Sequence, residues 1–116
     1  MTNTQKGKYG EELAVKYLEA QGYKILERNF RYSKFGEIDI IALKGKHLAF
    51  VEVKARSSGD FGHPLEAISR AKLEKIILSM RHYLSQTQVK YATYGLDAVS
   101  VFLKDGKIEH LENIEL

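Results

Sequence analysis

The chain has 116 residues, of which 44% are hydrophobic and 28% are charged, the composition of an ordinary globular protein with one modest core. It contains no cysteine, which excludes a disulfide framework and a thiolate metal site. The N-terminus is polar and no apolar run approaches the length of a membrane span. We therefore expect a single domain over residues 1–116, located in the cytoplasm and without a membrane partner.

The net charge of +3 is unevenly distributed along the chain. Residues 1–90 carry 16 Lys and Arg against 10 Asp and Glu, a balance of +6, whereas residues 91–116 carry 2 against 5, a balance of −3. A basic body favours a polyanionic partner, because Lys and Arg neutralise the dense charge of a nucleic-acid backbone. Simple solubility explains the same charge, so charge alone leaves nucleic-acid binding open.

The first half of the chain predicts one helix and three strands. Apolar residues at helical spacing predict a helix over residues 7–21, which Gly22 ends. Strands are predicted over 23–32, 36–43 and 47–55. A short Lys-Gly-Lys turn joins the last two strands, so we expect them to form a hairpin.

The second half predicts a long helix and a second hairpin. Pro64 suits the first turn of a helix that runs to about residue 85, because its missing N–H has no partner there. Strands over 96–103 and 107–114 flank a turn at Asp105-Gly106. The predicted order is α-β-β-β-α-β-β, which indicates an α/β fold with a mixed sheet flanked by helices.

The central hairpin places three charged side chains on an otherwise apolar face. By alternation these are Asp39 on its first strand and Glu52 and Lys54 on its second. A two-residue turn at Gly45-Lys46 pairs residues whose numbers sum to 91, so Asp39 faces Glu52 and Glu37 faces Lys54. A three-residue turn would pair apolar residues of opposite faces, so we favour the even-length turn.

Two carboxylates directly opposite each other repel unless a proton, a lysine or a cation relieves them. Lys54 is within reach of Glu52, and Mg²⁺ suits a site with few carboxylates and several waters. Such an ion can polarise a phosphoryl oxygen and activate water. The alternative is a charged strand end with an ordinary Glu37–Lys54 ion pair, although burying charge on a two-sided strand is costly without a purpose.

Glu11 on the first predicted helix is a candidate third acid. It lies three residues before Ala14 and seven before Leu18, so it points along the apolar stripe toward the sheet. A core-facing Glu11 could join the Asp39 and Glu52 site. The alternative is an acid placed favourably near a helix N-terminus, where the helix dipole rewards it.

Basic residues on either side of the carboxylates are candidate phosphate contacts, since basic side chains are what a DNA backbone requires. These candidates are Arg28, Arg31, Arg56 and Lys72. Each one alone is equally consistent with solvated surface charge. The four histidines show no metal-ligand spacing.

An Asp on one strand followed by Glu-x-Lys on the next resembles the signature of the PD-(D/E)XK nuclease superfamily. More of the chain resembles the YraN-type family of uncharacterised bacterial proteins, which is similar to archaeal Holliday-junction resolvases. The segments that carry this resemblance are GKYGEELAVKYLEAQGY, RNFR, GEIDIIA, FVEVKARSS and FGHP, with Lys72 further on. The chain departs from the pattern at Ile38, where the signature has Pro, and at Gly95-Leu96-Asp97, where the family usually has Arg-Phe-Asp.

The resemblance implies a restriction-endonuclease-like core and a role for each matching residue. Asp39 and Glu52 match the metal-binding acids, Lys54 matches the catalytic lysine, and Glu11 matches the helix-borne acid of the resolvases. The implied activity is Mg²⁺- or Mn²⁺-dependent endonuclease cleavage of phosphodiester bonds in DNA, branched or structured DNA included. A symmetric homodimer is expected by analogy, because resolvases act on two-fold substrates.

Two alternatives remain open at this point. The chain could be a non-catalytic nucleic-acid-binding module that keeps the nuclease fold. It could also be a dimeric partner protein in which Lys54 alone relieves the two carboxylates.

Overall fold

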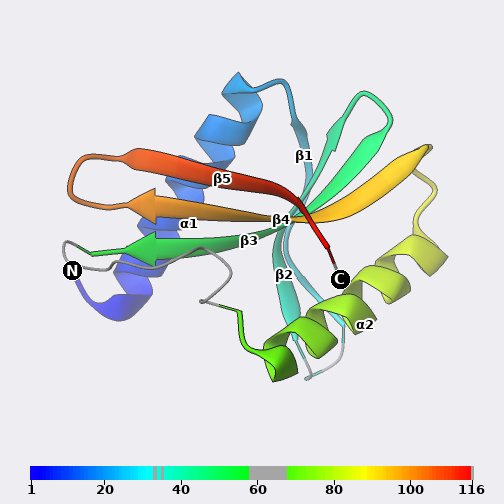
Figure 1. Ribbon diagram of the computed structural model, residues 1–116, viewed down its shortest axis with the longest axis horizontal. Coiled ribbons are helices and arrows are strands. Elements are labelled where there is room, and N and C mark those ends of the chain that lie inside the picture. The colour runs from blue at the N-terminus through cyan, green and yellow to red at the C-terminus, as the bar shows by residue number, and fades with distance from the viewer. Residues whose placement is uncertain (33, 35, 58–67, 116) are drawn as a thin grey trace.

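The computed structural model describes residues 1–32, 34, 36–57 and 68–115, and shows one twisted sheet with a helix packed against each face (Figure 1). The predicted order α-β-β-β-α-β-β is confirmed. In the described part of the chain the elements are α1 Asn3–Ala20, β1 Lys24–Arg31, β2 Glu37–Lys44, β3 His47–Arg56, α2 Arg70–Gln86, β4 Thr93–Phe102 and β5 Lys107–Ile114.

The strands lie in the sheet in the order in which they follow one another along the chain, from β1 to β5. Neighbouring strands are antiparallel except β3 and β4, which are parallel, so the sheet is mixed as predicted. A parallel pair needs a crossover connection, and α2 lies in that crossover. The pairing of β4 with β3 begins at Thr93, opposite His47, three residues before the predicted start of this strand.

Helix α1 begins four residues earlier than predicted. Thr2 caps it, because Thr2 Oγ1 accepts from the backbone N–H of Gln5 and the Gln5 side chain accepts from the N–H of Thr2. The first turns are polar and largely exposed, so apolar spacing could not reveal them.

No helix within the described ranges combines the length and the apolar character that a membrane crossing needs.

Helix α2 begins at Arg70 in the structure. Ser69 is its N-cap, and Ser69 Oγ accepts from the backbone N–H of Lys72 at 3.1 Å. The prediction placed Pro64 in the first turn, but residues 68 and 69 are not helical and Pro64 lies outside the described residues. A side-chain cap, rather than a proline, therefore sets the start of α2.

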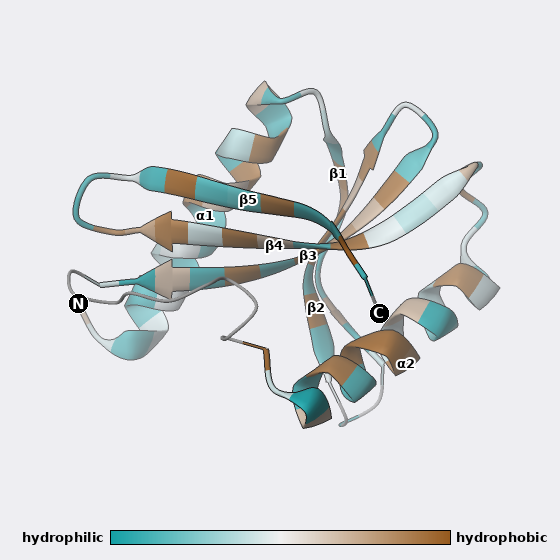
Figure 2. Cartoon of the chain, in the orientation of Figure 1, coloured by the Kyte–Doolittle hydropathy of each residue, from teal (hydrophilic) through white to brown (hydrophobic). Residues whose placement is uncertain are grey.

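Two apolar clusters lie on opposite faces of the sheet, and Figure 2 shows hydrophobic and hydrophilic residues alternating along the strands. On one face, α1 packs Ala14, Val15 and Leu18 against Ile40, Ala42, Ala49, Val51, Val99 and Val101. On the other face, α2 packs Ile76, Met80 and Tyr83 against Ile38, Ile41, Leu48, Phe50 and Leu96. Both faces are covered, as predicted for the central strands. Ile38 is the exception to the predicted faces, because it joins the α2 side whereas Ile40 joins the α1 side.

The hairpin register is confirmed over its paired length. Lys44 pairs with His47, and the pairing continues without a shift to Ile40 opposite Val51. Beyond that point β2 pairs only with β1, down to Glu37, and β3 pairs only with β4.

The two strands therefore separate, and Figure 1 shows β2 curving away from β3. We call the opening between residues 37–39 of β2 and residues 52–54 of β3 the fork. The predicted backbone pairs of Asp39 with Glu52 and of Glu37 with Lys54 do not form. Ile38 lies on the α2 face instead of with Ile40, so the regular alternation of β2 stops at the same point as its pairing with β3.

Candidate active site

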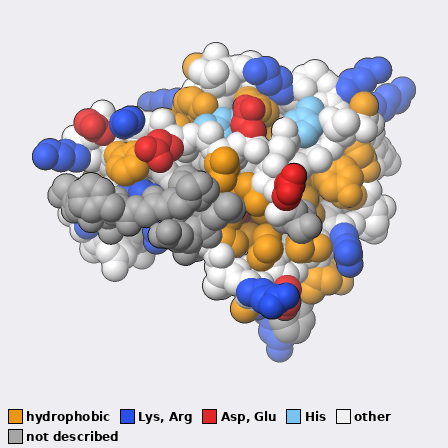
Figure 3. Space-filling model, viewed as in Figure 1, with side chains coloured by type: hydrophobic (Ala, Val, Ile, Leu, Met, Phe, Trp, Pro, Cys, Tyr) orange, Lys and Arg blue, Asp and Glu red, His pale blue; other side chains and the backbone are white. Residues whose placement is uncertain are grey.

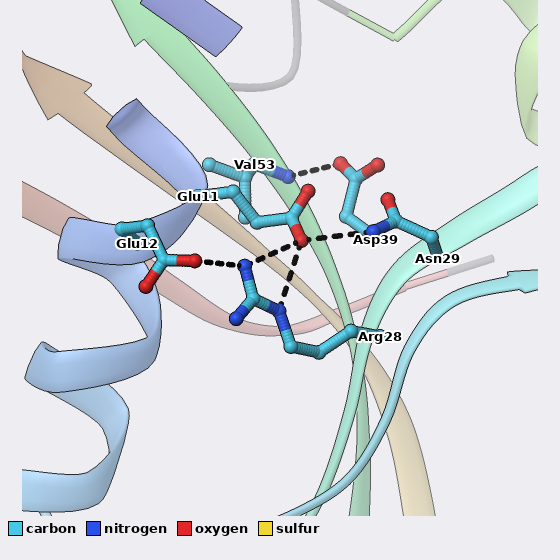
Figure 4. Close-up of polar contacts among 6 residues, drawn as sticks. All are labelled: Glu11, Glu12, Arg28, Asn29, Asp39 and Val53. Atoms are coloured by element: carbon cyan, nitrogen blue, oxygen red, sulfur yellow. Dashed lines mark hydrogen bonds and ion pairs between the residues drawn. The ribbon is translucent and has the colours of Figure 1, made fainter. Parts of the chain in front are cut away.

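Asp39 bridges the fork with its side chain. Its Oδ2 accepts a hydrogen bond from the backbone N–H of Val53 at 2.7 Å (Figure 4). At this position β2 no longer pairs with β3, so the backbone N–H of Val53 donates to a side-chain carboxylate instead of a backbone carbonyl. The bond holds the Asp39 carboxylate against β3, although Asp39 does not pair with Glu52 as predicted.

Glu52 is a buried acid on the β3 side of the fork. Only 5% of the residue is exposed, and its Oε1 has no hydrogen-bond partner among the described residues. Burial raises the pKa of Glu52 to about 9, and the neighbouring charge of Asp39 adds to the effect. Burial also raises the pKa of Asp39, although the hydrogen bond from Val53 opposes that shift. At neutral pH the pair therefore holds a proton unless a cation replaces it.

The lysine nearest to Glu52 is not the one expected from the sequence. Lys72 of α2 places its Nζ 3.7 Å from Glu52 Oε2 and lowers the pKa of both acids. Lys54 is exposed at the end of β3, so the expected relief of Glu52 by Lys54 is not what the structure shows. Helix α2 comes to this point through tertiary packing, which the spacing along β3 could not reveal.

Asp39 and Lys72 together line two pockets at the fork. A pocket of about 510 Å³ lies toward the start of α1 and is lined by Asn3, Lys6, Gly7, Asp39, Val53, Lys54, Ala55, Ser57 and Lys72. A pocket of about 220 Å³ lies toward α2 and is lined by Gly36, Glu37, Asp39, Glu52, Lys72, Lys75 and Ile76. Asp39 therefore borders both pockets, whereas buried Glu52 borders only the smaller of the two.

Glu11 is close to the fork but is held by other groups. Its Oε1 accepts from Arg28 Nε and from Asn29 Nδ2, each at 3.1 Å, and Arg28 also contacts Glu12 (Figure 4). The Glu11 charge contributes to the raised pKa of Asp39. Within the described ranges, no three His, Asp or Glu side chains are grouped so that they could hold a metal ion. In the described residues Glu11, Asp39 and Glu52 are therefore not grouped as a three-acid metal site, and the Glu11 carboxylate is bound by Arg28 and Asn29.

Asn29 has a backbone conformation that is unusual inside a strand. Its φ is 54°, in the left-handed region that non-glycine residues rarely adopt. Its neighbours Arg28 and Phe30 pair with Ile40 and Ile38, so Asn29 lies across β1–β2 from Asp39. In this conformation the Asn29 carboxamide donates to Glu11, and the bond links α1 to β1 at the position opposite Asp39.

The residues predicted to contact phosphate differ in how exposed they are and in whether they are already ion-paired. Arg28 is engaged by two acids, and Arg31 forms an ion pair with Glu37 at 2.9 Å while remaining 67% exposed. Arg56 is buried and donates from Nε to Ser100 Oγ, so the structure does not present it on the surface as expected. Figure 3 shows basic side chains around the periphery of the face in view rather than in one patch.

A buried polar network was missed from the sequence. Asp97 is 1% exposed, accepts from the N–H of Asn113, and lies 2.7 Å from His110 Nε2. His110 Nδ1 in turn lies 3.0 Å from the Tyr17 hydroxyl. The network ties α1 to β4 and β5. An aspartate within the apolar run of residues 96–101 was the signal that could have revealed it.

Comparison with known proteins places this chain in a family. The model of the uncharacterised protein family UPF0102 matches residues 10–101. A UPF0102 protein of Clostridioides difficile (strain 630) is 42% identical over 113 residues, covering 97% of this chain and 98% of that protein. Another from Kosmotoga olearia is 47% identical over 110 residues, covering 95% and 92%. The chain therefore belongs to the uncharacterised protein family UPF0102.

Proposed function

We propose that this protein is a divalent-cation-dependent nuclease that hydrolyses phosphodiester bonds in DNA. The observation that carries the proposal is Glu52 Oε1, which is buried beside Asp39 without a hydrogen-bond partner in the described structure. An unsatisfied buried polar atom costs about 1–3 kcal/mol, so a fold rarely keeps one without a use for it. Acids whose pKa values are raised in a pocket are typical of functional sites.

The donor set at the fork fits a hard divalent cation. Carboxylate oxygens are the ligands that Mg²⁺ prefers, and Mg²⁺ commonly uses one or two protein carboxylates while keeping several waters. Asp39 and Glu52 would hold the cation, and the described residues supply no third acid to the set. When bound, the cation would polarise a phosphoryl oxygen and offset the negative charge that develops during hydrolysis.

Lys54 of the fork and Lys72 of α2 have different roles in this proposal. Lys54 lines the larger pocket with Asp39 and is exposed, so its ammonium group can donate to a phosphate oxygen or orient the attacking water. Lys72 lies beside Glu52 and lowers the repulsion between the two acids when both are ionised. The resemblance of the Asp39, Glu52 and Lys54 pattern to PD-(D/E)XK nucleases supports the same assignment.

The test is cleavage of end-labelled single-stranded, duplex and branched DNA with Mg²⁺, with Mn²⁺ and with EDTA. We expect the wild-type protein to cut at least one substrate with a divalent cation and none in EDTA. Asp39→Asn and Glu52→Gln should each lose on the order of 100-fold or more in rate. Glu109→Gln, which changes an exposed acid on β5, is the matched control and should retain full activity. Survival of every substrate, or equal cutting by Asp39→Asn, would overturn the proposal.

A DNA-binding module without turnover is the competing function. It predicts salt-sensitive binding that Mg²⁺ does not change, because its affinity would come from phosphate contacts alone. Titrating labelled DNA in EDTA and in Mg²⁺, at two salt concentrations, separates the two functions. Binding that strengthens with Mg²⁺ in the wild type but not in Glu52→Gln favours the nuclease.

A further inference from the structure

An aromatic stack lies on the surface outside the fork. The rings of Tyr32, just past the end of β1, and His82 of α2 stack with their centroids 4.1 Å apart and their planes 19° from parallel. Phe30 stacks more distantly on His82 and meets the ring of buried Tyr83 edge-on. Exposed Tyr32 is thus backed by half-buried His82 and anchored to the core through Phe30, which makes its ring a rigid feature.

Core packing does not account for this pair. Tyr32 is 38% exposed, so it leaves a large part of an aromatic ring in water. The other exposed aromatic residues in ring contacts behave differently, since Tyr94 meets Tyr91 and Phe50 edge-on. Among the ring contacts of the described residues, near-parallel stacking occurs only at His82. A flat, anchored and exposed ring is a surface on which another planar group can stack.

The stack lies a short distance from the fork. Arg31, next to Tyr32, is the strand partner and ion-pair partner of Glu37, which lines the smaller pocket with Asp39 and Glu52. Lys75 of α2 lines the same pocket. His82 is seven residues further along the helix, which is about 10 Å at 1.5 Å per residue.

The helix that links the two places is basic. Among its charged side chains are Arg70, Lys72, Lys75 and Arg81, against the single acid Glu74. A nucleic-acid strand running from the fork along α2 would meet positive charge for its phosphates and an aromatic face for one of its bases. This combination is typical of proteins that bind single strands.

We propose that Tyr32 and His82 form a stacking site for an unpaired nucleobase of a DNA strand that is bound at the fork. The stacked base lies beyond the smaller pocket, about two helical turns past Lys75 along α2. The inference rests on the proposed function and narrows its substrate to DNA with a single-stranded or frayed segment beside the cleaved bond.

The test measures binding in EDTA, so that it does not depend on cleavage. Tyr32→Leu should weaken binding of a labelled 12-nucleotide single strand about tenfold, the loss expected for one stacked base, and should leave duplex binding unchanged. Tyr32→Phe keeps the ring and should bind as the wild type does. Tyr94→Leu is the matched control, because it removes an exposed ring near the β2–β3 turn, at the far end of the sheet from the fork.

A second substrate shows whether the lost contact is with a base. Placing one abasic position at a time along the single strand should weaken wild-type binding at one position. At that same position Tyr32→Leu should cause no further loss. A thermal melt of each variant confirms that the chain still folds.

The outcomes separate this inference from the proposed function. Wild-type protein that cuts DNA while Tyr32→Leu binds single strands normally would overturn the stacking site and leave the nuclease standing. Loss of single-strand affinity in Tyr32→Leu, with no cleavage by the wild type, would support the stacking site and reject the nuclease. Absence of single-strand binding by the wild type, or equal losses on single strand and duplex, would also overturn the stacking site.

Discussion

Asp39 accepts the backbone N–H of Val53 at 2.7 Å, just past the point where β2 and β3 stop pairing. One side chain therefore takes the place of a backbone carbonyl at the end of the ladder. Because the same carboxylate lies beside buried Glu52, its structural role and its proposed chemical role can be separated by substitution.

The Asp39–Val53 bond predicts a difference between two substitutions at Asp39. In Asp39→Asn the carboxamide oxygen can still accept the N–H of Val53, whereas Asp39→Ala leaves that N–H without its partner. We expect Asp39→Ala to be less stable than Asp39→Asn by about 1–3 kcal/mol, while both variants lose cleavage. Urea denaturation at pH 7 measures the free energies of unfolding. Equal stabilities of the two variants would mean that water satisfies Val53 and that the bond has no structural weight.

The raised pKa of Glu52 predicts how stability depends on pH. The folded protein keeps a proton on a group of pKa about 9, whereas the unfolded chain releases it near the ordinary value of 4.5. The free energy of unfolding should therefore fall as pH rises between these values, by at most about 1.4 kcal/mol per pH unit. Glu52→Gln removes this proton linkage, so its stability should be flatter with pH and higher than the wild type at pH 8.

Urea denaturation from pH 5 to pH 8.5 in EDTA checks this prediction. Glu109→Gln should keep the wild-type slope, because it changes an exposed acid on β5 and leaves Glu52 in place. Parallel pH profiles for the wild type and Glu52→Gln would show that Glu52 is ionised in the folded protein.

A divalent cation should stabilise the protein through the same two acids. With 10 mM Mg²⁺ and a millimolar dissociation constant, the gain is about 1.4 kcal/mol, or a few degrees in melting temperature. The gain should be larger at pH 8.5 than at pH 6, because protons compete with the cation for Asp39 and Glu52. Thermal melts with KCl at matched ionic strength provide the baseline. The same gain in Glu52→Gln would place the cation elsewhere.

Asn29 should act as a positioning residue for Glu11. Asn29→Gly keeps the left-handed backbone at little cost and removes the bond from Nδ2 to Glu11, whereas Asn29→Ala also strains the backbone. We expect Asn29→Ala to be about 1–2 kcal/mol less stable than Asn29→Gly. Both should cut DNA more slowly than the wild type. Full activity in Asn29→Gly would show that holding Glu11 does not matter for the reaction.

Several features were determined by the sequence alone because they depend on neighbours close along the chain. Alternation with a period of two set the faces of β3 and of residues 40–43 of β2, and the short turn set the register as far as Ile40 opposite Val51. Helical spacing and the Gly22 stop located most of α1. The same local rules placed Asp39 and Glu52 just beyond the paired part of the hairpin, although the predicted pairing of these two residues does not form.

Other features were decided only by the tertiary structure, because they join residues from elements that local rules do not connect. The pairing of β2 with β3 ends before Asp39, which opens the fork. Packing of α2 brings Lys72, rather than Lys54, to Glu52. Packing of α1 against β1 lets Arg28 and Asn29 hold Glu11. Arg56 was predicted to contact phosphate at the surface, but it is buried and donates a hydrogen bond to Ser100. The candidate acids were therefore visible in the sequence, whereas their partners depended on how helices and strands pack.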